Sequence, residues 1–358
     1  MNIAIICPKI SRSDGIGRIA NSIIDLLTAR GITVKVLTVN PYGFWGRIQR
    51  FSYRYQLGFL FDLGFVFFSS VQLKTRYRDY KSIAPSHLCP ISTDQIHFTS
   101  CNFHSLKVSG GLWKLFLSPS NLVYTFIEFI LYKNCNQAIF ISEQQFDQYK
   151  TYYGNRKKES KVIYPVLSDG CFPGLTHDYY FGENLFKKGC SKALFIGYDF
   201  RMKGLDIARK AAEHANLALD VVGVDGRYDK GSVLESERFL GAIEFPAIDW
   251  SGYGFLLFPS HSDAYALVVQ EAFRNGLIPI CSSQAGGSEV LVDVGLSDCV
   301  VSQPAKKDVS SEQFLSVLYS DCCLDYRNKG IFDSTDFLSS KIYNQDEYIS
   351  DVLLTLLS

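Results

Sequence analysis

The chain has 358 residues, a length that favours two domains over a single compact core. Hydrophobic residues make up 47% and charged residues 20%, a composition that excludes an intrinsically disordered chain. The net charge is zero, but residues 1–165 hold 20 Lys and Arg against 9 Asp and Glu, and residues 166–358 hold 16 against 27. This asymmetry indicates either a basic half that meets phosphate or an anionic membrane, or two halves that attract each other.

The ten cysteines form no C-x-x-C pair and do not cluster with histidine, which is typical of reduced thiols in a cytoplasmic protein. Met1 leads into a strand-like run that lacks the basic segment and cleavage site of a signal peptide. The longest apolar stretch, residues 55–71, is interrupted by Asp62 and two glycines and is short for a membrane span. We therefore expect a cytoplasmic protein.

The first half alternates predicted strands and helices. Residues 2–7 predict a strand, which is followed by a glycine-containing loop, a helix that stops at Gly31 and a second strand over 32–40. Further strands are expected at 95–100 and 137–142, each followed by a helix. Such units form parallel sheets, which bind ligands at the carboxyl ends of their strands.

The second half repeats this pattern. It begins with a strand at 192–197, a loop, a helical stretch and a strand at 217–224. Three short apolar runs then predict strands at 255–260, 277–283 and 299–302. Strands that alternate with helices in both halves predict an α/β fold.

Turn-forming residues cluster at 162–174 and mark the passage between the halves. We expect two Rossmann-like, doubly wound parallel-sheet lobes, the first over residues 1–165 and the second over residues 166–344. The last residues, 345–358, predict a helix with an apolar face, which we expect to pack back on the first lobe.

The segment 43–81 has an unusual composition. Seven basic residues flank an aromatic-rich centre. Four of its aromatic residues belong to types that favour a membrane interface, namely Trp45, Tyr53, Tyr55 and Phe59. One interpretation is peripheral contact with the anionic inner face of the cytoplasmic membrane. The other is a pair of amphipathic helices that cover the first sheet, and the sequence leaves both open.

The first loop, DGIGR at 14–18, places Gly15 and Gly17 in front of a helix. Glycines let backbone amides approach a ligand, and the helix N-terminus favours an anion. The loop lacks the G-x-G-x-x-G spacing, and Asn40 rather than an acid ends the next strand. We therefore expect no nicotinamide cofactor.

The second loop, GYDFRMKG at 197–204, places Arg201 and Lys203 between a strand and a helix. Cations at the carboxyl edge of a sheet can bind a diphosphate. The alternative is a solvated turn.

The segment HSDAYALVVQEAFRNG at 261–276 carries Asp263 in a predicted loop and Glu271 about two turns into a predicted helix. Carboxylates accept hydrogen bonds from vicinal hydroxyls, so ribose or hexose can bind both acids. Backbone amides at the helix start can receive phosphate oxygens, namely those of Tyr265, Ala266 and Leu267. Alternatively, Asp263 caps the helix and Glu271 is a half-buried helix acid.

A fourth segment between a predicted strand and a predicted helix, SSQAGGSEVL at 282–291, has paired glycines before Glu289. Together with DGIGR, GYDFRMKG and PSHSDAYALVVQEA, its GGSEVL resembles, in order and spacing, the motifs of family 4 glycosyltransferases. These are retaining enzymes of the GT-B fold, which has two facing Rossmann-like lobes. The resemblance covers nearly the whole chain and looks closest to bacterial lipopolysaccharide-core glucosyltransferases.

The resemblance implies a role for each matched residue. Glu271 would bind the nucleotide ribose, Lys203 would hold the donor diphosphate, and Asp263 stands where a glutamate contacts the transferred sugar. Gly15 and Gly17 resemble the first-lobe loop that closes on the donor.

The chain departs from the family pattern at three places. Tyr198 replaces the family arginine of the second loop, so Arg201 is expected to substitute for it. Asp263 is one methylene shorter than glutamate, which can change the sugar preference. The usual glycines after this acid are Ala264 and Ala266.

The segment DQIHFTSCNFH at 94–104 resembles the family's D-x-x-H-x-H strand end, although Thr99 stands at the second histidine position. His97 or His104 would then reach the reacting centre and position the acceptor hydroxyl or stabilise charge. Either histidine can instead be structural.

The resemblance implies transfer of a hexose from a nucleotide diphosphate sugar, UDP-linked, to a lipopolysaccharide, O-antigen or other surface-glycan precursor. The implied partners are this donor and a glycan or lipid-linked glycan acceptor, with no nucleic acid, cofactor or metal, because cations can neutralise the leaving diphosphate. Two alternatives stay open: a nucleotide-sugar 2-epimerase of the same fold, and a non-catalytic scaffold for glycan assembly.

Overall fold

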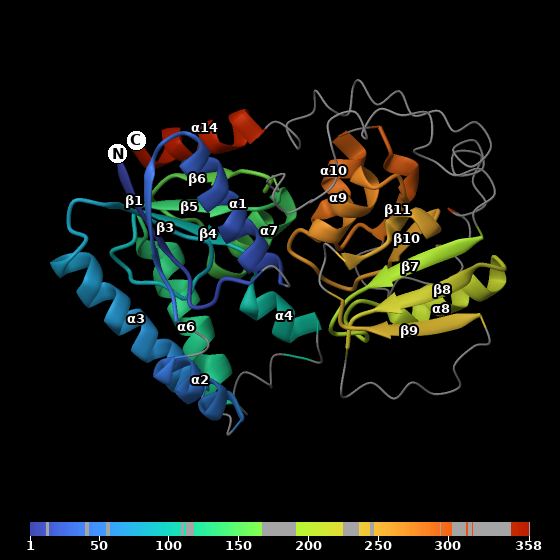
Figure 1. Cartoon of the computed structure of the whole chain (residues 1–358), viewed down its shortest axis with the longest axis horizontal. Coiled ribbons are helices and arrows are strands. Elements are labelled where there is room, and N and C mark those ends of the chain that lie inside the picture. Colours follow the sequence, from blue (N-terminus) through green and yellow to red (C-terminus); the bar gives the residue numbers. More distant parts are fainter. Residues whose placement is uncertain are drawn as a thin grey trace. The chain divides into compact units, whose positions relative to one another are not determined.

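The computed structural model describes residues 1–11, 14–39, 43–54, 58–108, 111, 118–166, 191–224, 236–243, 247–293, 295–302, 313, 317 and 345–357. The chain divides into two compact units, Met1–Cys171 with Lys341–Ser358, and Phe172–Ser340. Each unit contains one six-stranded sheet whose described strand pairs are all parallel, with helices packed around it (Figure 1). The predicted α/β fold with two doubly wound parallel sheets is confirmed.

The sheet of the first unit has the strand order β2-β1-β3-β4-β5-β6. β1 lies between β2 and β3, so the loops that follow β1 and β3 leave the carboxyl edge at neighbouring positions. The strands are β1 (Asn2–Ile6), β2 (Thr33–Leu37), β3 (Lys81–Ala84), β4 (Gln95–Phe98), β5 (Gln137–Phe140) and β6 (Ser160–Val162).

Helices cover this sheet. In α1, Ile19, Ile23 and Leu27 repeat every four residues and are buried, as expected of an amphipathic helix. No helix in the described part of the chain is long and apolar enough to cross a membrane. The helices are α1 (Gly15–Ala29), α2 (Phe44–Arg54), α3 (Gly58–Thr75), α4 (Asn102–Val108), α6 (Pro119–Asn134), α7 (Glu143–Tyr153) and α14 (Gln345–Leu357).

The C-terminal helix α14 packs against α1 in the first unit (Figure 1). A buried polar chain also joins it to the sheet. Gln95 of β4 donates from Nε2 to the carbonyl oxygen of Val352, 3.0 Å away, and its Oε1 lies 3.0 Å from Nε2 of His97. Because an amide oxygen only accepts, the proton of the neutral His97 ring lies on Nε2 in this arrangement.

The sheet of the second unit has the strand order β12-β11-β10-β7-β8-β9. The chain builds one side of the sheet from β7 to β9 and then returns to start the other side with β10, which pairs with β7. The junction of β7 with β10 is therefore the switch point of a doubly wound sheet. The strands are β7 (Lys192–Ile196), β8 (Ala218–Val222), β9 (Glu237–Gly241), β10 (Phe255–Phe258), β11 (Ile278–Ser282) and β12 (Val300–Val301).

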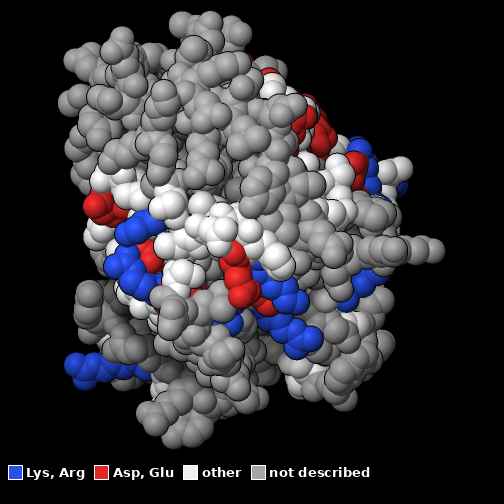
Figure 2. All heavy atoms as spheres, turned by 90° about the vertical axis from the view of Figure 1, so that its right-hand side faces the viewer, with Lys and Arg blue, Asp and Glu red and all other residues white. Residues whose placement is uncertain are grey.

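Three α-helices are described in the second unit: α8 (Leu205–His214), α9 (Leu267–Arg274) and α10 (Gly287–Asp293). Arg209 of α8 pairs with Glu237 at 2.6 Å, and Arg238 binds Asp220 through two nitrogens. On the face that Figure 2 shows, described acidic and basic side chains likewise lie next to each other. Local pairs therefore neutralise part of the acidic charge of this unit.

His97 makes the stability of the first unit depend on pH. Burial lowers the pKa of its imidazole from 6.5 to about 4, so between these pH values the unfolded chain binds a proton that the folded chain does not. Stability therefore falls as the pH falls through this window. We expect wild type to lose about 1.6 kcal/mol more than His97→Gln between pH 6.5 and 5.0, measured by chemical denaturation. Equal losses of unfolding free energy in wild type and His97→Gln would contradict a neutral, buried His97.

Candidate functional site

The candidate site lies at the carboxyl edge of the second sheet. Because β7 and β10 are parallel neighbours, the loops that follow them, residues 197–204 and 259–266, emerge side by side. The backbone N–H of His261 donates to the carbonyl oxygen of Met202, 2.9 Å away, and joins the two loops. The sheet topology thus brings together segments that lie about sixty residues apart in the sequence.

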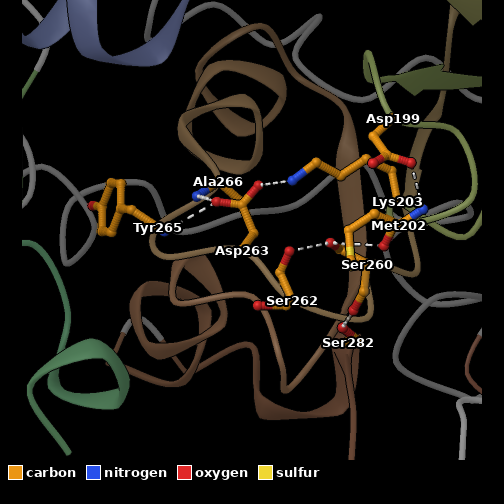
Figure 3. A network of polar contacts seen from close by, with 9 residues as sticks. All are labelled: Asp199, Met202, Lys203, Ser260, Ser262, Asp263, Tyr265, Ala266 and Ser282. Carbon is orange, nitrogen blue, oxygen red and sulfur yellow. Dashed lines mark hydrogen bonds and ion pairs between the residues drawn. The ribbon is translucent and has the colours of Figure 1, made fainter. Parts of the chain in front are cut away.

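An ion pair between Lys203 and Asp263 bridges the two loops (Figure 3). The Lys203 Nζ donates to Oδ2 of Asp263, and the two side chains are 22% and 20% exposed. The ammonium also lies 5.5 Å from the centroid of the Phe258 ring. Partial burial on an aromatic ring limits screening of the charges by water, so this pair is stronger than an exposed ion pair.

The second carboxylate oxygen of Asp263 accepts hydrogen bonds from the backbone just before α9. Oδ1 accepts from the backbone N–H of Tyr265 at 3.1 Å and from that of Ala266 at 2.7 Å (Figure 3). Burial raises the pKa of the Asp263 carboxyl, but the Lys203 ammonium and these hydrogen bonds outweigh burial and hold the pKa below its usual value. Asp263 is therefore ionised at neutral pH and fully engaged by one cation and two amides.

Serine hydroxyls support the loop beneath this ion pair. The Ser260 hydroxyl donates to the carbonyl oxygen of Ser262 at 3.0 Å, and Ser282 of β11 donates its hydroxyl to the carbonyl oxygen of Ser260 (Figure 3). On the other loop, the Asp199 carboxylate accepts from the N–H of Met202 at 3.0 Å. Both loops are thus held in place by local hydrogen bonds.

The fourth predicted junction, residues 282–291, packs against the same loop. The Asp263 N–H donates to the carbonyl oxygen of Gln284 at 3.1 Å, and the Gly286 N–H donates to the carbonyl oxygen of Asp263 at 2.9 Å. A Cβ at Gly287 would lie only 2.4 Å from the carbonyl oxygen of Tyr265, so glycine is needed there. Three of the four motifs predicted from the sequence therefore meet at this edge.

Ala266 precedes α9 in the left-handed conformation, with φ 59° and ψ 66°. This conformation costs a non-glycine residue about 1–2 kcal/mol. A family glycine is expected at this position, and the structure shows the backbone geometry that favours glycine. The alanine keeps this geometry, so the amides at the start of α9 are directed as a glycine would direct them.

Glu271 lies in α9, and its side chain is fully buried. It is buried more deeply than the half-buried helix acid of the alternative interpretation, and its role in ribose binding stays a prediction. Gln270, its neighbour, donates to the hydroxyl of the buried Tyr265. Arg201, in contrast, is exposed, and among the described residues no hydrogen bond or ion pair joins its guanidinium to the Lys203–Asp263 pair.

Gly15 and Gly17 lie in the first turn of α1 rather than in the loop before it. The Gly17 N–H donates to Oδ1 of Asp14 at 2.7 Å, which caps the helix. A Cβ at Gly17 would lie 2.0 Å from the carbonyl oxygen of Ser11. Gly17 thus allows the β1–α1 loop to fold closely against the helix, and its amide is already engaged.

The two histidines of the first unit have different surroundings. His97 is 1% exposed inside β4 and its ring is bound to Gln95, so the structure gives it a place in the core, and its role at a reacting centre stays a prediction. His104 lies in α4, half-buried, with Nδ1 3.3 Å from the hydroxyl of Tyr152. Burial and nearby Lys107 lower its pKa, so it is neutral at pH 7, and its role stays a prediction.

Glu128 of α6 was not predicted from the sequence. Its buried carboxylate accepts from the backbone N–H of Asn102 at 2.9 Å and from the hydroxyl of Tyr149, and so fixes the start of α4, which carries His104. Burial raises its pKa to about 7. The signal available in the sequence was a single acid in an otherwise apolar helical stretch.

The described residues contain no group of three or more His, Cys, Asp or Glu side chains that could hold a metal ion. Around the Lys203–Asp263 pair the candidate site contains a cation, a carboxylate and the amides before α9, and the place of Glu271 in it stays a prediction. The combination of a cation, helix-start amides and a carboxylate can bind an anion that carries hydroxyl groups.

No protein-family model matches the sequence, and no curated protein is similar to it in sequence. Solved structures are similar in fold. WaaG, a glycosyltransferase involved in lipopolysaccharide biosynthesis, matches with a TM-score of 0.68 and 17% identity over 98% of this chain and 99% of its own. The chain has the GT-B glycosyltransferase fold.

Two further structures agree over nearly their whole length. The sucrose-phosphate synthase of Thermosynechococcus elongatus matches with a TM-score of 0.68 and 15% identity, over 99% of this chain and 97% of its own. HepE of Anabaena, solved with UDP and glucose, matches with a TM-score of 0.60 and 13% identity over 99% of both chains. The predicted GT-B fold is confirmed by these likenesses.

Gly204 holds the two loops together through close backbone packing. It has φ +73°, and an added Cβ would lie 2.3 Å from the carbonyl oxygen of Pro259. Gly241 has a nearly identical φ of +75° but no atom within 4 Å of an added Cβ. We expect Gly241→Ala to lower the free energy of unfolding by about 1 kcal/mol and Gly204→Ala by at least about 2 kcal/mol more, in urea denaturation. Equal losses would show that the loops do not pack this closely.

Proposed function

We propose that the protein is a retaining glycosyltransferase that moves a hexose from a UDP-linked sugar to a sugar hydroxyl of a lipopolysaccharide, O-antigen or other surface-glycan precursor. The observation that carries this proposal is the Lys203–Asp263 pair beside the start of α9, at the switch point of the second sheet. The fold supports it, because WaaG is named as an enzyme of lipopolysaccharide biosynthesis and HepE was solved with UDP-glucose.

The donor diphosphate would bind to Lys203 and to the amides of Tyr265, Ala266 and Leu267. Lys203 and the first two amides are bound to Asp263 in the structure, so the Asp263 carboxylate stands in for an anionic phosphate oxygen. Donor binding would therefore replace one anion by another, without leaving the lysine unpaired. Asp263 would then turn to the sugar hydroxyls, and Glu271 would bind the ribose.

The chemistry needs stabilisation of a leaving diphosphate. The bond between the anomeric carbon and the diphosphate oxygen breaks, and a bond to the acceptor oxygen forms on the same face of the sugar. The acceptor proton passes to the departing phosphate oxygen. Lys203 and the helix-start amides lower the barrier by stabilising the negative charge that develops on the diphosphate.

A screen of UDP, GDP, ADP and dTDP sugars by thermal shift and by hydrolysis tests this proposal. We expect UDP sugars to raise the melting temperature and to be hydrolysed slowly. Lys203→Ala should lower turnover at least tenfold, which corresponds to about 1.4 kcal/mol in the barrier. Lys210→Ala, an exposed lysine of α8 outside the site, is the matched control.

Three results would contradict the proposal. Turnover of Lys203→Ala at the wild-type rate would show that this lysine does not take part in the reaction. Epimerisation of the nucleotide sugar without an acceptor would indicate a 2-epimerase. The absence of any nucleotide-dependent thermal shift would indicate a scaffold for glycan assembly.

We also propose that α2 and α3 contact an anionic membrane surface, in line with the predicted role of residues 43–81. α2 contains three arginines and no acidic residue. On α3, the aromatic side chains of Phe67 and Phe68 are 72% and 58% exposed. Exposed aromatic side chains beside cations favour the interface of an anionic membrane.

Sedimentation with vesicles tests membrane contact. We expect binding to anionic vesicles that weakens with salt, because cations on α2 meet the lipid phosphates. The double substitution Phe67→Ser and Phe68→Ser should weaken binding at least tenfold. Leu354→Ser, which removes an equally exposed apolar side chain from α14, should leave it unchanged. Vesicle binding that changes neither with the salt concentration nor with the substitution of Phe67 and Phe68 would contradict the proposal.

A further inference from the structure

The first unit contains a cavity of about 820 Å³ between the edge strand β2 and the helices α2 and α3. Trp45 and Ile48 of α2 and Phe61 and Phe65 of α3 contribute to its mainly apolar lining. The volume falls in the range of small-molecule binding pockets, which are also lined mainly by apolar and aromatic side chains. All lining residues belong to the first unit, so this cavity is separate from the Lys203–Asp263 site.

α3 presents one face to this cavity. Leu60, Gly64 and Phe68 recur every four residues and therefore share a face of the helix, and all three line the cavity. Gly64 leaves this face open, because a Cβ added there would meet no atom within 4 Å. A helix that is apolar around its circumference is normally buried, yet exposed Phe67 and Phe68 also line this cavity. The apolar surface of α3 thus continues from the solvent into the cavity.

The charges of the lining are all positive. Lys35 of β2 and Arg76, just after α3, are exposed and line the cavity, so they lie at its opening. The lining contains no Asp or Glu, and neither cation forms an ion pair with a described residue. An apolar interior with cations at the opening complements a ligand that has a long hydrocarbon chain and an anionic end.

We propose that this cavity binds one hydrocarbon chain of an anionic membrane phospholipid, whose phosphate meets Lys35 and Arg76. The exposed aromatic side chains that continue into the cavity provide the path by which a chain leaves the bilayer. This binding does not depend on the transfer reaction, because none of the lining residues belongs to the residues assigned to that reaction. A negative result for lipid binding would therefore leave the proposed glycosyltransferase function untouched, and the reverse also holds.

Calorimetric titration with palmitoyl lysophosphatidylglycerol, a single-chain anionic lipid, below its micelle-forming concentration tests this proposal. We expect one lipid per chain. Gly64→Phe fills the cavity and should weaken binding at least tenfold. Leu63→Phe adds the same ring to α3 at a 38% exposed position outside the lining and should bind as wild type. Gly64→Leu serves in the same way if the larger side chain prevents folding.

The head group provides a second readout. Lysophosphatidylcholine should bind at least tenfold more weakly than lysophosphatidylglycerol, and the double substitution Lys35→Ala and Arg76→Ala should remove this preference. Lys74→Ala with Arg78→Ala, which changes two exposed cations outside the lining, should preserve it.

Several outcomes would overturn the proposal. Undiminished lipid binding by Gly64→Phe would place the lipid on the outer surface of α3. No binding by wild type would show that the cavity does not accept a lipid chain. A dimer without lipid that Gly64→Phe dissociates in sedimentation velocity would show that a second copy of the chain fills the cavity.

Discussion

The pairing of β7 with β10 is the constraint on which the candidate site depends. It places two loops from distant parts of the sequence at one position on the carboxyl edge of the second sheet. The Lys203–Asp263 ion pair and the close contact of Gly204 with Pro259 both require these two strands to be adjacent. If another pair of strands were adjacent, the same residues would lie apart and the site would not form.

Charge balance explains how this site can be stable without a ligand. A partly buried lysine and the amides before a helix both favour an anion, and leaving them without one is costly. The Asp263 carboxylate supplies that anion within the chain. The shorter side chain of aspartate suits this arrangement, because it folds back onto the amides of Tyr265 and Ala266, which follow it within three residues. The proposed donor diphosphate would therefore compete with Asp263, which would couple donor binding to release of the side chain proposed to contact the sugar.

The sequence predicted those parts of the fold that leave a local signal. Strands such as β10 and β11 are continuous apolar runs, and both were predicted. β3, β6 and β9 were not predicted, because none of the sequences KSIA, SKV and ERFLG is a continuous apolar run. α1 begins earlier than expected, because Asp14 caps it and draws Gly15 and Gly17 into its first turn.

The site itself was only partly predictable. The motifs identified Lys203 and Asp263, but their ion pair depends on strand order, which no local pattern encodes. The direction of the His97 ring could not be predicted, because a histidine near a strand end looks the same in sequence whether its ring points to a cleft or into the core. The cavity beside α3 arises from the packing of three elements, and the sequence showed only an aromatic-rich segment there.

A crystal structure with bound UDP would show whether this site holds the donor. We expect the β-phosphate to take the place of the Asp263 carboxylate, with Lys203 and the amides of Tyr265 and Ala266 on its oxygens and Glu271 on the ribose. UDP bound elsewhere, with Lys203 still paired to Asp263, would contradict this expectation.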